Sequence, residues 1–188
     1  KQMTKKPCFD FSAGFFPNLF FELFNLLTLG VYVEAFIVFI YTKISKNKYL
    51  KVNWILGAAI FIRQDLFIRL GGFDKDYFMF FEETDLCKRV SDKGYEVIYG
   101  PELQIHHIGS VSGKKDYSLF TKRIYSSKYI FMTKHFSPIK KASMKLLLFI
   151  QVISQILLWI IIFPLNRKKS NQKLNGFLYL LKHKMRMN

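Results

Sequence analysis

Residues 78–89, FMFFEETDLCKR, decide how the rest of the chain is interpreted. Three carboxylates stand within four positions directly after an aromatic run, and apolar residues then recur at Leu86, Cys87 and Val90. That spacing places the three apolar side chains on one face of a helix. The sequence therefore predicts a helix from Glu83 to Lys93 with one buried face, ended by Gly94.

The three carboxylates, Glu82, Glu83 and Asp85, favour an acid–base function. Like charges repel one another, and the neighbouring aromatic rings limit hydration, so both effects are expected to raise the pKa of these groups. A raised pKa suits a general base that must hold a proton transiently. The charge pattern alone equally suits an acidic helix N-terminus on a solvated surface, where the helix dipole favours negative charge.

The elements expected around this segment alternate between short strands and helices. Residues 15–45 predict two packed helices, with Asn18 as a cap and Gly30 as a stop or break, and membrane contact as the alternative. An apolar run of strand length predicts a buried strand from Asn53 to Arg63. The remaining expectations are a helix at 64–70 stopped by Gly71-Gly72, strands at 95–99 and 103–106, a flexible loop at 109–115, and helices from Tyr117 onward.

Charge divides the chain unevenly. The formal net charge is +16, yet residues 65–116 carry ten acidic groups, and residues 117–188 carry fourteen basic groups and no Asp or Glu. No nucleic-acid-binding signature accompanies the basic tail, whose lysines alternate with long aliphatic runs, so we expect no nucleic-acid partner.

An apolar segment, Leu146–Leu165, is long enough to cross a bilayer. Gln151, Ser154 and Gln155 form a polar stripe on one face, and basic residues flank both ends. A single span would carry one basic flank across the membrane, so the pattern favours a helix lying in the interface of an anionic leaflet. A spanning or re-entrant helix and a buried soluble helix are the alternatives.

Two histidines, His106 and His107, follow the expected third strand and offer a metal ligand, although oxygen ligands would have to come from elsewhere. A structural role is the alternative for both. Cys8 and Cys87 match no metal-ligand spacing and are expected to pack as small apolar side chains, which weakly favours a reducing compartment. No signal peptide is evident.

The order of the motifs resembles that of family 2 glycosyltransferases, most closely the bacterial rhamnosyltransferase type that builds cell-surface polysaccharides. The resemblance covers about residues 10–136. It rests on these stretches in succession: WILGAAIFIR (54–63), GGFD (71–74), FMFFEETDLCKR (78–89), GYEVIYGP (94–101) and HIGSVS (107–112).

The resemblance implies an α/β chain with a partial GT-A (nucleotide-diphospho-sugar transferase) fold, followed by a helical, membrane-associating tail. The implied reaction is inverting transfer of a sugar from a nucleotide-diphosphate sugar to a lipid-linked glycan, aided by Mg²⁺ or Mn²⁺. Residues that match the motifs are Glu83 as catalytic base, Glu82 and Asp85 as groups that orient the base or bind acceptor hydroxyls, Trp54 as an acceptor-stacking ring, Gly57 and Ala58 on the donor side, and His107 as a metal ligand.

One departure from the family pattern is large. No Asp-x-Asp metal motif precedes Trp54, and Asp74-Lys75-Asp76 does not match it. The resemblance therefore implies the C-terminal, acceptor-side part of a transferase without its donor-binding half. We divide it into a helical lead-in (1–52), an acceptor-side catalytic part (53–116) and a basic tail (117–188).

The expected location is the cytoplasmic face of a bacterial cell membrane. An inactive membrane-binding remnant, or a subunit that needs a separate donor-binding partner, is the main alternative. A purely structural membrane protein is the third.

Overall fold

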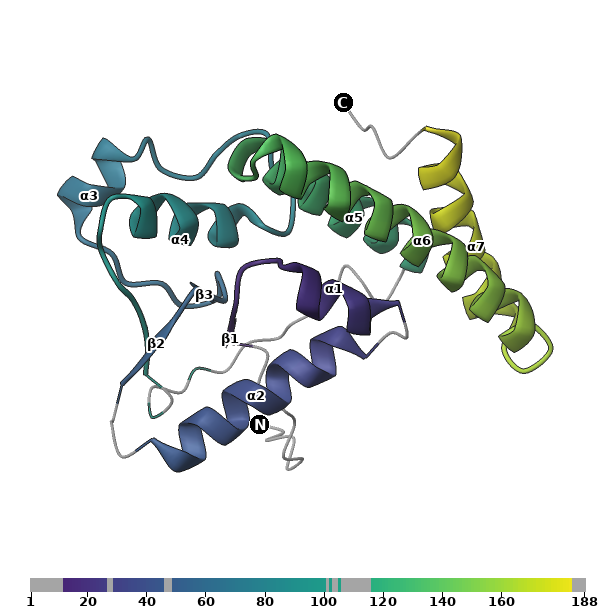
Figure 1. Ribbon diagram of the computed structural model, residues 1–188, viewed down its shortest axis with the longest axis horizontal. Helices are drawn as coiled ribbons and strands as arrows, with labels where there is room; N and C mark the ends of the chain where they lie inside the picture. The colour runs from purple at the N-terminus through teal and green to yellow at the C-terminus, as the bar shows by residue number, and fades with distance from the viewer. Residues whose placement is uncertain are drawn as a thin grey trace.

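The computed structural model describes residues 12–26, 29–45, 49–100, 102, 105 and 116–183. Within this part the chain is a mixture of helices and two small sheets (Figure 1). That architecture is consistent with part of an α/β fold. Cys8, most of the strand expected at 103–106, the loop at 109–115 and both His106 and His107 lie outside the described residues. The division into three segments stays a prediction.

The N-terminal part folds into a short strand and two packed helices, as predicted. Strand β1 (Ala13–Gly14) leads into α1 (Leu19–Asn25) and α2 (Gly30–Ile44). The Asn18 side chain accepts a hydrogen bond from the backbone N–H of Phe21 at 3.1 Å, so it caps α1 as expected.

Gly30 has a different role from the one predicted. It begins α2 instead of ending a helix, and α1 already ends at Asn25. A Cβ on Gly30 would lie 2.6 Å from the carbonyl oxygen of Phe21. Only glycine therefore permits this close approach of the two helices.

Both sheets are antiparallel pairs. Strand β1 pairs with β3 (Trp54–Ile55), with Gly14 opposite Trp54, and β2 (Leu50–Val52) pairs with β4 (Val97–Tyr99). The strand predicted from Asn53 to Arg63 is therefore wrong over most of its length. After Ile55 the chain turns, residues 57–59 are exposed, and Phe61 is 90% exposed. An apolar run of the right length had suggested burial on both faces, but its partner β1 is only two residues long.

Two glycine-terminated helices pack on these strands. α3 (Gln64–Arg69) is followed by Gly71 and Gly72, and α4 (Glu82–Asp92) by Gly94, all with positive φ, as the predicted stops require. Helix α4 confirms the predicted apolar face. The shared core consists of Ala13, Leu50, Val52, Leu66, Cys87, Val90 and Val97, and Leu86 is also buried.

The tail forms three helices, as predicted: α5 (Tyr117–His135), α6 (Pro138–Ile162) and α7 (Arg167–Lys182). Phe131, Met144 and Leu148 lie in the core between α5 and α6, and Val152, Phe177 and Leu180 in the core between α6 and α7. A buried ion pair joins the tail to the N-terminal part, since Lys128 Nζ lies 2.7 and 2.8 Å from the two carboxylate oxygens of Glu22.

Helix α1 packs against both α2 and α6 (Figure 1). Among the described residues, α6 is the one helix that is long and apolar enough to cross a bilayer by length and composition, and 22% of its most apolar window is buried. Its polar stripe turns inward, because Gln151 Nε2 donates to the Asn25 carbonyl and Ser154 Oγ to the Leu26 carbonyl at the end of α1.

Candidate functional site

The N-terminus of α4 follows a strained turn. Phe80 and Phe81 both have positive φ, 70° and 68°, a conformation that bulky residues seldom adopt and that costs about 1–3 kcal/mol each. Ring contacts hold them there, with Phe80 against Phe120 and Phe81 against Phe131 of α5. The turn leads into α4, whose second residue, Glu83, lies beside Gly57 in the turn that follows β3.

Glu83, the second residue of α4, has a carboxylate that is only partly hydrogen-bonded within the described residues. The residue is 9% exposed, and its Oε2 is buried without a hydrogen-bond partner among the described residues. Gly57 lies opposite, where a Cβ would stand 3.7 Å from Glu83 Cβ and 3.9 Å from Oε1. The β3 turn therefore meets the Glu83 carboxyl with backbone alone, with no side chain from position 57 between them.

Burial raises the pKa of the Glu83 carboxyl, and the neighbouring Glu82 charge raises it further, although the backbone amides of Glu83 and Gly57 oppose both effects. This outcome confirms the direction expected from the sequence for Glu83. The alternative of a solvated acidic helix end is wrong here, because Glu83 and Asp85 are both buried. Glu82 also has one oxygen, Oε2, that is buried without a partner among the described residues.

Asp85 behaves in the opposite way. It is 1% exposed, and its oxygens lie 2.7 Å from Arg89 Nε, 2.6 Å from His135 Nε2 and 3.2 Å from the Tyr77 hydroxyl. Burial opposes its ionisation, but the hydrogen bonds from His135 and Arg89 lower its pKa below the ordinary value. The raised pKa expected for all three acids is therefore wrong for Asp85, which the structure places in a cluster of donors.

Arg89 extends this cluster to the glycine loop before it. Its two terminal nitrogens donate to the carbonyls of Leu70 and Gly72 at 2.7 and 2.9 Å, while its Nε donates to Asp85. Lys134 of α5 holds the next part of the loop through Asp74 and Asp76. One network thus fixes the loop, α4 and the end of α5 relative to one another.

Trp54, Gly57 and Ala58 lie on and directly after β3. The indole of Trp54 is half-buried, and its Nε1–H donates to the Phe15 carbonyl at 3.0 Å, which fixes the ring against the N-terminal segment. Gly57 and Ala58 are exposed in the turn. The structure brings Gly57 to Glu83; it assigns no ligand to Trp54 or Ala58.

The described residues contain no group of three His, Cys, Asp or Glu side chains that could hold a metal ion. Asp74 and Asp76 face Lys134 instead. His107 lies outside the described residues, so its role as a ligand stays a prediction.

Sequence reasoning missed Tyr77, Arg89 and His135 as partners of Asp85. The i,i+4 spacing of Asp85 and Arg89 was a usable signal for an ion pair on one helix face. No comparable signal connects Asp85 with His135, fifty residues away.

Comparison with known proteins places the chain near rhamnosyltransferases. It is 31% identical over 86 residues to the N-acetylglucosaminyl-diphospho-decaprenol L-rhamnosyltransferase of Mycobacterium tuberculosis, a match that covers 46% of this chain and 28% of that protein. It is 38% identical over 69 residues to the rhamnosyltransferase WbbL of Escherichia coli K12, covering 35% of this chain and 26% of WbbL.

The matches thus span less than a third of the length of these relatives. No family model and no solved structure matches the chain. The similarity supports a relationship to a glycosyltransferase family.

Proposed function

We propose that the chain is the acceptor-side part of an inverting glycosyltransferase with a GT-A fold, and that Glu83 is its catalytic base. The observation that carries the proposal is the buried Glu83 carboxylate beside Gly57, with a raised pKa and an oxygen that no described residue meets with a hydrogen bond. The rhamnosyltransferase relatives support the same class of reaction.

In this proposal Glu83 accepts the proton of an acceptor hydroxyl. The hydroxyl oxygen attacks the anomeric carbon of the sugar, the bond from that carbon to the nucleotide diphosphate breaks, and the electron pair leaves with the diphosphate. A carboxylate whose pKa is raised by burial holds the proton better than a solvated one, while the backbone amides of Glu83 and Gly57 oppose that rise by stabilising the charged form.

The neighbouring residues receive supporting roles. Glu82, with its own unpartnered oxygen, binds an acceptor hydroxyl. Asp85 is hydrogen-bonded to three protein side chains. We therefore propose that its main role is to orient α4, and that it affects acceptor binding indirectly, through the groups it positions. Trp54 stacks on an acceptor sugar, and the backbone at Gly57 and Ala58 lies near the donor.

A divalent ion, Mg²⁺ or Mn²⁺, would neutralise charge on the leaving diphosphate, with His107 as one ligand. The described residues do not complete such a site. The other ligands, like the nucleotide-sugar pocket, are proposed to belong to a donor-binding half that matches the remaining length of the relatives.

The proposed acceptor is a lipid-linked glycan, since the mycobacterial relative is named for a decaprenol-linked one. Helix α6 supports a position at the membrane surface, because its polar stripe faces α1 and its apolar side chains face outward. Basic residues near both ends of the helix suit the anionic cytoplasmic leaflet. An inactive remnant that keeps only membrane binding is the second candidate.

The deciding experiment compares Glu83→Gln with Glu96→Gln in the chain assembled with its donor-binding half. Transfer of labelled sugar from nucleotide-sugar donors to a lipid-linked acceptor is measured, with circular dichroism as the check on folding. Glu96 pairs with Lys51 on the surface and serves as the matched control. We expect loss of transfer by about 10²–10⁴-fold for Glu83→Gln alone. Equal transfer by the two variants would exclude Glu83 as the base, and no transfer by the parent would favour the remnant.

A further inference from the structure

Helices α1 and α2 present an apolar outer surface. On α1 the exposed side chains are Leu19, Phe20 and Leu23, and on α2 they include Phe36, Phe39 and Ile44, with Leu29 exposed just before the helix. Monomeric soluble proteins seldom expose contiguous apolar patches of more than a few hundred Å². Helix α1 also packs on α6, which exposes apolar side chains of its own: Leu146, Phe149, Ile150, Ile153, Leu157, Ile160 and Ile161.

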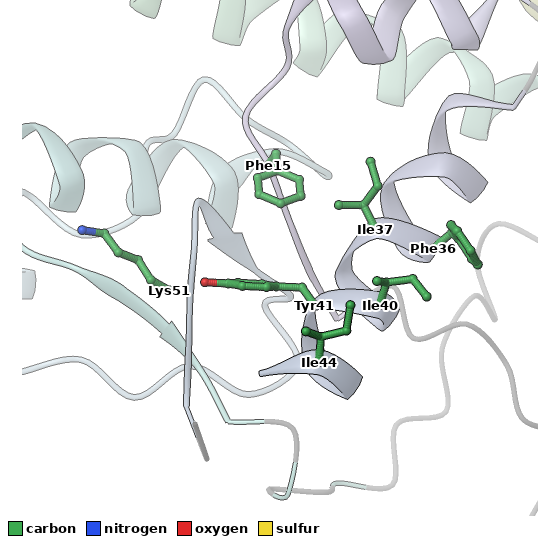
Figure 2. A pocket seen from close by; sticks show the side chains of 7 residues that line it. All are labelled: Phe15, Phe36, Ile37, Ile40, Tyr41, Ile44 and Lys51. Atoms are coloured by element: carbon green, nitrogen blue, oxygen red, sulfur yellow. The ribbon is translucent and has the colours of Figure 1, made fainter. Parts of the chain in front are cut away.

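An apolar groove of about 520 Å³ opens along α2. Figure 2 shows its lining: Phe36, Ile37, Ile40, Tyr41 and Ile44 from α2, with Phe15 and Lys51 opposite. Its polar groups are few, and the Lys51 ammonium is already paired with Glu96 at 2.6 Å. Such a groove gives water little to bind and suits hydrocarbon chains.

Charge distinguishes a bilayer from other apolar partners. The two acids on these helices both turn inward, since Glu22 pairs with Lys128 and Glu34 accepts from the Phe15 amide at 2.6 Å. The tail that supplies α6 has no acid at all. One lysine, Lys43, lies in the last turn of α2, and the sequence continues with lysines at 46, 48 and 51, as it does beyond α6. Apolar faces bordered by basic residues and lacking carboxylates are typical of helices that lie on anionic membranes.

We infer that the outer faces of α1 and α2, including the groove, insert into the acyl boundary of an anionic bilayer together with α6. The inference extends the membrane location in the proposed function from one helix to three. It also brings the bilayer close to the candidate site, because Phe15, in the wall of the groove, accepts the hydrogen bond of Trp54.

The test compares two double variants. Phe36→Ser/Ile44→Ser changes α2, and the matched control Phe61→Ser/Ile68→Ser changes one residue before α3 and one on it. Helix α3 lies well away from α2 (Figure 1). The exposed fractions are 51% and 75% in the first pair and 90% and 66% in the second, so both variants should fold. Binding is measured by co-sedimentation with vesicles of phosphatidylcholine and phosphatidylglycerol mixed about two to one.

We expect the α2 pair to weaken vesicle binding about tenfold or more. Each inserted apolar side chain contributes a binding free energy in proportion to the apolar area it buries, and the variant loses that contribution at two positions. The control pair should change it by less than about twofold. As a direct measure of insertion, Ile44→Trp and Ile68→Trp are compared in a chain carrying Trp54→Phe and Trp159→Phe. Brominated phospholipids should quench the fluorescence of the first and leave the second unaffected.

Three outcomes would overturn the inference. If the α2 pair binds like the parent while Ile153→Ser/Leu157→Ser on α6 does not, α6 alone docks and the proposed membrane location survives. If the parent binds no vesicles, both membrane claims fail. If the α2 pair instead converts a dimer to a monomer in solution, the surface is an interface between copies of the chain. Transfer to a water-soluble acceptor tests Glu83 separately from all three.

Discussion

Replacing Arg89 by methionine should destabilise the fold severely. Arg89 is the partner of Asp85, which is 1% exposed, and removing one member of a buried ion pair costs about 3–5 kcal/mol. The carbonyls of Leu70 and Gly72 lose their donors as well. His135 still faces Asp85 and the guanidinium is partly exposed, so we expect the lower end, about 3 kcal/mol.

Urea unfolding followed by circular dichroism measures this difference, with Arg69→Met as the matched control. Arg69 pairs with Asp65 on the surface, where such pairs contribute about 0–1 kcal/mol. Because the pKa of Asp85 is lowered in the fold, its contribution is present above its unfolded pKa and is lost as the pH falls through the folded one. The loss of stability caused by Arg89→Met should therefore become smaller below about pH 4. Equal losses for Arg89→Met and Arg69→Met at pH 7 would refute the network.

Three further substitutions test the site and its scaffold. Glu83→Gln should stabilise the fold at pH 7 but not below about pH 4, because a carboxyl with a raised pKa loses its favourable contribution to stability as the pH rises. Thermal unfolding at both pH values measures this difference. A variant less stable than the parent at pH 7 would contradict it. Gly57→Ala places a methyl group in ordinary contact with Glu83, 3.7–3.9 Å away, so unfolding should be nearly unchanged while transfer falls. Unchanged transfer would mean that substrate does not approach from that side. Gly30→Ala puts its Cβ 2.6 Å from the Phe21 carbonyl and should cost about 1–3 kcal/mol in urea unfolding, with parent-like stability as the contrary result.

Features set by neighbouring residues were predictable from the sequence. The apolar face of α4 and its stop at Gly94, the cap at Asn18 and the gathering of polar residues on one face of α6 all follow from local spacing. The inward direction of that polar face was not predicted, because it depends on carbonyls at the end of α1. The raised pKa of Glu83 was also predicted, from the aromatic neighbours that limit its hydration and from the adjacent carboxylates.

Features that depend on distant partners were not predictable. Residues 53–63 have a strand composition, but a strand forms only where another backbone pairs with it, and β1 offers two residues. The sign of the pKa shift of Asp85 depends on His135, and the inward turn of Glu22 on Lys128, 106 residues away. The residues next to an acid in the sequence indicate how well its carboxylate is hydrated. They do not indicate which hydrogen-bond donors another helix will place beside it.

The contact between His135 and Asp85 has a geometric consequence at the membrane. His135 is the last residue of α5, and α6 begins three residues later at Pro138, so the helix proposed to lie in the bilayer is tied directly to the helix that carries Glu83. In that orientation the height of the base above the lipid headgroups is a fixed dimension of the protein. Under the proposed function, the enzyme would then select acceptors by length, because a lipid-linked glycan would react only when the hydroxyl at its growing end stands at that height.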